Sequence, residues 1–196
     1  MLSGINYFRD GIIVAKSGNV VVYSLNDKLY LEIGPGHNLW ALESEIDEYK
    51  KQLGNIPGGN CLEIGLGLGI ASRCILSYPH VDSLTTIEKN VDVIQTHKQL
   101  CPTLSTKENK YGWVDYSKCV HRIYNCDGLE YLYVTKNKYN FVFLDCWDRI
   151  DEETLVQITD LVNAARKVLT DNGKVIGWYD PYTPEEFRPF FDKIFV

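Results

Sequence analysis

Three glycines, spaced two residues apart, follow directly on a strand-like stretch at residues 60–64. They are Gly65, Gly67 and Gly69 in the segment CLEIGLGLG, and an apolar run comes after them. Glycine permits positive φ angles and lets the backbone approach another group closely where a strand turns into a helix. The segment therefore predicts a strand, a ligand-binding loop and a helix in direct succession.

Strand-like and helix-like segments alternate along the rest of the chain, which is typical of a parallel sheet with crossover helices. The predicted strands cover residues 60–64, 83–88, 120–125, 139–145 and 174–179. The predicted helices lie near 69–78, 90–100, 127–135, 151–169 and 184–191, and residues 193–196 are expected to add one edge strand. We therefore expect an α/β fold with a doubly wound, Rossmann-like and mostly parallel sheet.

The residues before this pattern differ from it. Two strands, at 19–24 and 28–33, are joined by a turn and predict a β-hairpin. Apolar residues recur at helical spacing between residues 40 and 53, and a glycine- and proline-rich stretch follows. The sequence thus predicts an N-terminal hairpin and helix appendage, residues 1–58, and a cofactor-binding core, residues 59–196.

Composition limits the surroundings and the partners of the chain. Its 196 residues suit one α/β domain with a short appendage. The apolar runs are far below the roughly 20 residues of a membrane span, and no basic stretch followed by an apolar signal region begins the sequence, so a cytoplasmic location is expected. The net charge of −6 disfavours a nucleic-acid partner. Six cysteines without a CxxC pair predict no metal site.

The acids around the glycine loop indicate the class of ligand. Glu88 ends the next predicted strand and can accept hydrogen bonds from both hydroxyls of a ribose. A dinucleotide loop would need glycine or alanine at position 70, where this chain has Ile70. Glu63 would repel a pyrophosphate but suits an ammonium group. A nucleoside joined to a sulfonium amino acid therefore fits better than a dinucleotide.

These residues resemble the class I S-adenosylmethionine-dependent methyltransferases, over about residues 59–180. Glu63 with the three glycines is similar to the first motif of that family, and Glu88 is similar to its ribose-binding acid. Asp127 and Gly128 resemble the segment that binds adenine. Asp145 closes the fourth core strand, where the resemblance implies a position facing both the substrate and the methionine end of S-adenosylmethionine.

The chain also resembles the spermidine synthase group, the aminopropyltransferases, within that superfamily. The hairpin appendage, the helix that leads into the core, and the acid pair Asp145 and Asp148 carry this resemblance, which implies that the two acids hold and deprotonate an amine. The group usually has a GGGDG loop and a DxxDP segment, whereas this chain has GLGLG and carries Arg149 in place of the proline. Both departures favour a methyl donor over decarboxylated S-adenosylmethionine.

Group transfer from a sulfonium is an in-line displacement, so the protein must hold the nucleophile and remove its proton. Ligands of an open parallel sheet bind beyond the carboxyl ends of its strands. Asp145 and Asp148 are therefore the candidate catalytic residues, and Trp147 and Tyr179 the candidate substrate-binding walls. The alternative is that Asp148 is a solvated loop acid and that Trp147 packs in the core.

Three functions remain open at this point. A methyltransferase that acts on a small molecule or a protein side chain is favoured; a spermidine synthase-like aminopropyltransferase and a catalytically silent binding protein are the alternatives. Methylation of nucleic acid is disfavoured because no [DNS]PP[YFW] segment follows the fourth core strand. An uncovered edge of the sheet would invite a homodimer.

Overall fold

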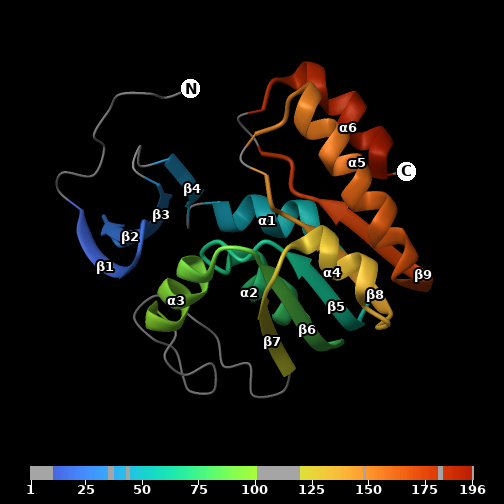
Figure 1. The fold of residues 1–196 in the computed structure, drawn as a ribbon, viewed down its shortest axis with the longest axis horizontal. Helices are drawn as coiled ribbons and strands as arrows, with labels where there is room; N and C mark the ends of the chain where they lie inside the picture. The colour runs from blue at the N-terminus through green and yellow to red at the C-terminus, as the bar shows by residue number, and fades with distance from the viewer. Residues whose placement is uncertain are drawn as a thin grey trace.

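The computed structural model describes residues 11–34, 38–42, 45–100, 120–147, 149–180 and 183–195. Within these ranges the chain forms a four-stranded antiparallel sheet, followed by a five-stranded parallel sheet with helices on both faces (Figure 1). None of the described helices is long and apolar enough to cross a membrane.

The parallel sheet begins at its centre and grows outward in two directions. Its strand order is β7-β6-β5-β8-β9, and every neighbouring pair is parallel. The strands are β5 (Gly59–Ile64), β6 (Val81–Glu88), β7 (Val120–Asn125), β8 (Tyr139–Leu144) and β9 (Leu169–Gly177). Because the winding direction reverses between β5 and β8, a crevice is expected beyond the carboxyl ends of these strands. The predicted doubly wound fold is confirmed.

Two hydrophobic cores explain why the central strands read as continuous apolar runs. Phe141 and Phe143 of β8 are buried on one face, with helices α1 (Ile46–Leu53), α2 (Ile70–Leu76) and α3 (Val91–Leu100). Val142 and Leu144 are buried on the other face, with α4 (Gly128–Val134) and α5 (Glu152–Lys167). Successive side chains of a strand point to opposite faces, so a strand covered on both sides has no polar face.

Two acids fix the beginnings of the helices on this second face. The Asp127 side chain accepts hydrogen bonds from the backbone N–H groups of Leu129 and Glu130 at the start of α4. Asp151 forms a capping box with Thr154 at the start of α5. Such caps satisfy N–H groups that have no partner inside the helix, and they set where each helix begins relative to the preceding strand.

The N-terminal region has four strands rather than a hairpin. They are β1 (Ile12–Ser17), β2 (Val20–Leu25), β3 (Lys28–Ile33) and β4 (Asn38–Leu42), paired in chain order. The predicted turn between β2 and β3 is present, with Asn26 and Asp27 at φ 51° and 60°, as a tight hairpin requires. The sheet packs on α3, where the Ser17 hydroxyl donates to Asp92 at 2.7 Å.

Two predictions for the ends of this fold are wrong. Residues 40–42 belong to β4, and the helix begins only at Ile46. The apolar spacing of this segment suits a strand as well as a helix, and pairing with β3 decides for the strand. Residues 193–195 continue α6 (Arg188–Phe195), after a 3-10 turn at Glu185–Phe187, and form no edge strand. Phe191 anchors α6 in the core.

Candidate functional site

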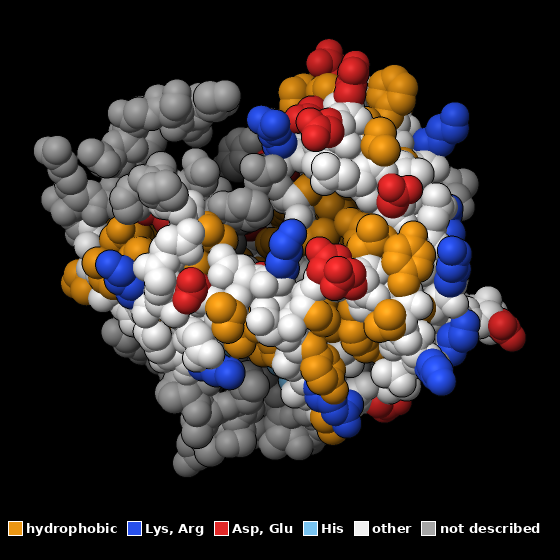
Figure 2. Space-filling model, viewed as in Figure 1, with side chains coloured by type: hydrophobic (Ala, Val, Ile, Leu, Met, Phe, Trp, Pro, Cys, Tyr) orange, Lys and Arg blue, Asp and Glu red, His pale blue; other side chains and the backbone are white. Residues whose placement is uncertain are grey.

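A cavity of about 810 Å³ lies at the carboxyl ends of the parallel strands. The glycine loop, the ends of β6, β7 and β8, and parts of β3, α1 and α5 line it. Figure 2 shows the molecule hollowed near the centre of this face, with apolar side chains in the hollow and charged ones around it. The cavity therefore occupies the crevice that the strand order predicts.

The glycine loop forms the floor of this cavity. The Gly65 N–H donates to the Ile87 carbonyl at 2.8 Å, and the Asp145 N–H donates to the Ile64 carbonyl at 2.8 Å. These two hydrogen bonds hold the start of the loop between the ends of β6 and β8. Gly65 has a φ of 98°, and a Cβ atom there would overlap the Asp145 carbonyl oxygen, so only glycine fits.

The other two glycines also have positive φ angles, 49° at Gly67 and 70° at Gly69. Gly67 lines the cavity together with Gly65. Gly69 is the residue that precedes α2 and is not among the lining residues. The structure therefore assigns Gly69 to the turn into the helix rather than to the cavity wall.

Replacing Gly65 with alanine is expected to lower the free energy of unfolding by at least about 2 kcal/mol, because strain and overlap with the end of β8 act together. Gly34 provides a matched control, since its φ is 88° but no described residue beyond its chain neighbours lies within 4 Å of a Cβ atom there. Gly34→Ala should cost only about 1 kcal/mol. Chemical denaturation of the two variants measures the difference, and equal losses would contradict the tight contact.

Glu88 lies at the end of β6 with both carboxylate oxygens held by the backbone. One oxygen accepts from the Leu66 N–H at 3.0 Å and the other from the Asn90 N–H at 2.7 Å. A carboxylate oxygen has two lone pairs, so each can accept a second hydrogen bond from a ligand. Glu88 lines the cavity, and its orientation is fixed before any ligand arrives.

Asp127 and Gly128 line the cavity from the end of β7. One Asp127 oxygen caps α4, and the other lies 3.8 Å from the Lys89 ammonium. A Cβ atom on Gly128 would overlap the side chain of Ile64. The structure thus brings both predicted residues to one side of the cavity, next to the end of the central strand.

Glu63 is fully buried but does not line the cavity. The hydroxyls of Ser72 on α2 and Thr86 on β6 both donate to the same carboxylate oxygen. Burial raises the pKa of Glu63 to about 8, although these two hydrogen bonds act in the opposite direction. Glu63 therefore lies in the interior, where the charges of Asp145 and Glu88 also raise its pKa, but it does not reach the cavity wall.

Asp145 lines the cavity directly after β8, where it accepts a hydrogen bond from the Tyr49 hydroxyl at 2.6 Å. Removal from water raises the pKa of Asp145 to about 7, and the carboxylates of Asp180 and Glu88 add to this. The hydrogen bond from Tyr49 acts in the opposite direction. A carboxyl group with this pKa can exchange a proton near neutral pH.

The remaining predicted residues occupy different places. Trp147 lines the cavity, and its Nε1 donates to the Trp178 carbonyl at 3.0 Å. Tyr179 does not line it, because the Tyr179 hydroxyl donates to the Pro184 carbonyl and its ring packs on Phe191. Asp148 lies outside the described residues.

Sequence reasoning missed several residues of the cavity wall. Leu31 and Ile33 of β3, Tyr49 of α1 and Gln157 and Asp160 of α5 all line the cavity. They lie far along the chain from the motifs, and their positions depend on how the N-terminal sheet and the helices dock. In the sequence Tyr49 occupies one of the apolar positions of a helix, which gave no sign of its hydrogen bond.

Comparison with known proteins identifies the family. Residues 49–178, more than half of the chain, match the family model of the spermine/spermidine synthase domain. A curated polyamine aminopropyltransferase from Prochlorococcus marinus (strain MIT 9312) is 25% identical over 130 residues, which are 66% of this chain and 43% of the relative. The chain therefore matches less than half the length of that relative.

Solved structures agree on the fold. The spermidine synthase from Thermotoga maritima aligns with a TM-score of 0.63 at 17% identity, over 94% of this chain and 61% of that chain. An S-adenosylmethionine-dependent methyltransferase from Agrobacterium tumefaciens aligns with a TM-score of 0.53 at 10% identity, over 91% and 59% of the two chains. Both the expected superfamily fold and the expected similarity to the spermidine synthase group are present. The chain belongs to the spermine/spermidine synthase family.

Proposed function

We propose that this chain is an enzyme that transfers an aminopropyl group from decarboxylated S-adenosylmethionine to a small amine. One observation carries the choice of donor. Among the described residues that line the cavity, four are carboxylates, Glu88, Asp127, Asp145 and Asp160, and the only cation is Lys89, which already lies beside Asp127. A cationic donor suits these walls, whereas the carboxylate of S-adenosylmethionine would meet mainly like charge.

The donor is proposed to lie along the glycine loop. Glu88 accepts hydrogen bonds from the ribose hydroxyls through lone pairs that the backbone leaves free. Asp127 and Gly128 lie beside the adenine, and the close approach allowed by Gly65 and Gly67 accommodates the chain that carries the sulfonium. In this arrangement the sulfonium charge lies among carboxylates.

The reaction requires no covalent enzyme intermediate. The lone pair of the acceptor nitrogen attacks the propyl carbon that is bonded to sulfur, the carbon–sulfur bond breaks, and its electron pair leaves with a neutral thioether. The nitrogen then gives one proton to Asp145, which is suited to receive it because burial raises its pKa to about 7. Tyr49 keeps the receiving carboxylate oriented. Asp148 is the candidate for a second amine-holding acid.

Methyl transfer is the second candidate, because the GLGLG loop and Arg149 depart from the usual aminopropyltransferase pattern. The family match and the curated relative support aminopropyl transfer better than methyl transfer. The acidic residues that line the cavity also favour aminopropyl transfer. The acceptor proposed here is accordingly a small amine rather than a protein side chain.

Calorimetry with the two donors tests this proposal. Decarboxylated S-adenosylmethionine is expected to bind at least about tenfold more tightly than S-adenosylmethionine, because one repelled carboxylate easily contributes the roughly 1.4 kcal/mol that this ratio requires. Neutral methylthioadenosine serves as the control for binding of the nucleoside alone. Tighter binding of S-adenosylmethionine would favour methyl transfer, and binding of neither donor would favour a silent protein.

A further inference from the structure

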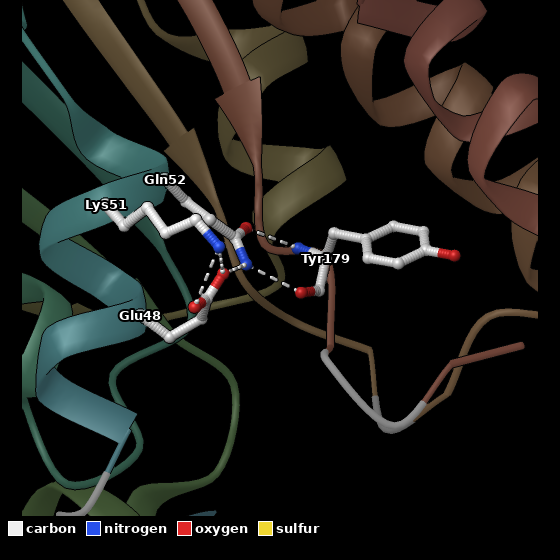
Figure 3. A network of polar contacts seen from close by, with 4 residues as sticks. All are labelled: Glu48, Lys51, Gln52 and Tyr179. Atoms are coloured by element: carbon white, nitrogen blue, oxygen red, sulfur yellow. Dashed lines mark hydrogen bonds and ion pairs between the residues drawn. The ribbon is translucent and has the colours of Figure 1, made fainter. Parts of the chain in front are cut away.

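Helix α1 contacts the end of β9 through one side-chain amide. The Gln52 Nε2 donates to the Tyr179 carbonyl at 2.7 Å, and the Tyr179 N–H donates to the Gln52 Oε1 at 2.9 Å. Figure 3 shows the amide facing this peptide backbone, with Glu48 on the side away from Tyr179. Tyr179 is 4% exposed, so its backbone groups have little access to water as an alternative partner.

The backbone directly after β9 explains why this pair forms. The Trp178 N–H donates to the Leu144 carbonyl at 2.8 Å, and the Trp178 carbonyl accepts from Trp147, so the backbone groups of Trp178 face the β8 side. In extended backbone the groups of the next residue face the opposite side. The Tyr179 groups therefore need a partner away from β8, and Gln52 supplies both halves of it.

The same face of α1 carries the contact with Asp145. Tyr49 and Gln52 are three residues apart and so lie on one side of the helix. The Tyr49 ring stacks on Trp178 with centroids 3.9 Å apart and planes 9° apart, and its hydroxyl donates to Asp145. Helix α1 thus contacts two adjacent residues that follow β9, Trp178 through Tyr49 and Tyr179 through Gln52.

The Gln52 amide is itself oriented by its helix. Its Nε2 also donates to Glu48 Oε1 at 3.2 Å, and the Lys51 ammonium contacts the same carboxylate at 3.4 Å. Both contacts come from residues of α1 one turn apart or less. The amide therefore reaches Tyr179 in one orientation, with its donor toward the carbonyl and its acceptor toward the N–H.

We propose that Gln52 is a positioning residue, which holds α1 against the end of β9 and thereby keeps the Tyr49 hydroxyl on Asp145. The inference rests on the proposed function, in which Asp145 receives the proton of the acceptor amine. Gln52 does not line the cavity, so it acts on the reaction only through Tyr49 and Trp178.

The effect on Asp145 has a definite sign. Asp145 faces the Tyr49 hydroxyl from α1, the Asp180 carboxylate after β9 and the Glu88 carboxylate after β6. The two carboxylates raise the pKa of Asp145, whereas the hydroxyl lowers it. Loss of the Tyr49 contact therefore raises this pKa further. Less of the proton-accepting form is then present at neutral pH, and the acidic limb of the pH–rate profile moves upward.

Gln52→Met tests the proposal, since methionine keeps the length of the side chain and removes its hydrogen bonds. The control is Lys50→Met on the same helix, whose side chain is 61% exposed and pairs with Asp47 rather than with Glu48. The pKa of Asp145 is measured by carboxyl ¹³C NMR without substrate, and turnover is then measured against pH. The full chain is used throughout.

The expected result for Gln52→Met is a rise of about half a unit in the pKa of Asp145, with a fall in kcat of about twofold at pH 7 and a donor Kd within about twofold. Lys50→Met should leave all three unchanged. If Gln52→Met does not fold, Gln52→Asn, which keeps the amide but shortens its reach, should show the same shift in pKa. An unchanged pKa in either folded variant would overturn the role of Gln52. A raised pKa with unchanged turnover would support that role and instead overturn the function proposed for Asp145.

Discussion

Replacing Asp145 with asparagine is expected to reduce turnover by roughly 100-fold or more while the donor affinity stays within about tenfold. Asparagine has nearly the same shape and can still accept the hydrogen bond from Tyr49. It cannot take up the proton that the attacking amine loses. Steady-state kinetics with calorimetry of the donor separate the two effects.

Asp171→Asn is the matched control for this prediction. It makes the same chemical change in β9, at an exposed position that does not line the cavity, and should leave turnover unchanged.

The parent enzyme should lose activity as the pH falls through about 7, because the pKa of Asp145 is raised to that value and protonation removes its accepting form. Equal turnover in Asp145→Asn and the parent would refute Asp145 as the proton acceptor.

Replacing Glu88 with alanine is expected to weaken donor binding by roughly 100-fold. Two hydrogen bonds from ribose hydroxyls to a charged acceptor contribute roughly 1.5–3 kcal/mol each, and part of this is offset when water enters the vacated site. The change also frees the Leu66 and Asn90 N–H groups that the carboxylate orients. Calorimetry with the decarboxylated donor measures the loss.

Asp82→Asn is a suitable control, because Asp82 lies at the exposed amino end of the same strand, far along β6 from Glu88. It should bind the donor as the parent does. Thermal unfolding of both variants shows whether the Glu88 change acts on the fold or on the site. Unaltered donor binding in a folded Glu88→Ala variant would remove the sugar contact from the proposal.

The parallel core could be predicted because local signals and tertiary structure agree there. β8 is buried on both faces and reads as a continuous apolar run, and Asp127 and Asp151 mark the beginnings of α4 and α5 in the sequence itself. The ends of the chain are different. β1 begins with the exposed Ile12 and Ile13 and shows no alternation, and β4 is a strand because β3 lies beside it.

The candidate site divides in the same way. Gly65, Glu88 and Asp145 could be predicted to meet, because the carboxyl ends of neighbouring parallel strands share one edge of the sheet. Tyr49 and Leu31 could not, since their positions depend on the docking of the N-terminal region over that edge. The position of Glu63 depends on which face of β5 its side chain takes, and Ser72 and Thr86 hold it in the interior rather than in the cavity wall.

Product analysis tests the proposed reaction most directly. The full chain is supplied with equal concentrations of both donors and a panel of aliphatic monoamines and diamines, and the products are identified by mass spectrometry. We expect an amine lengthened by one aminopropyl group, together with methylthioadenosine in equal amount, and roughly 100-fold less of both when Asp145→Asn replaces the parent. A methylated amine accompanied by S-adenosylhomocysteine would contradict aminopropyl transfer.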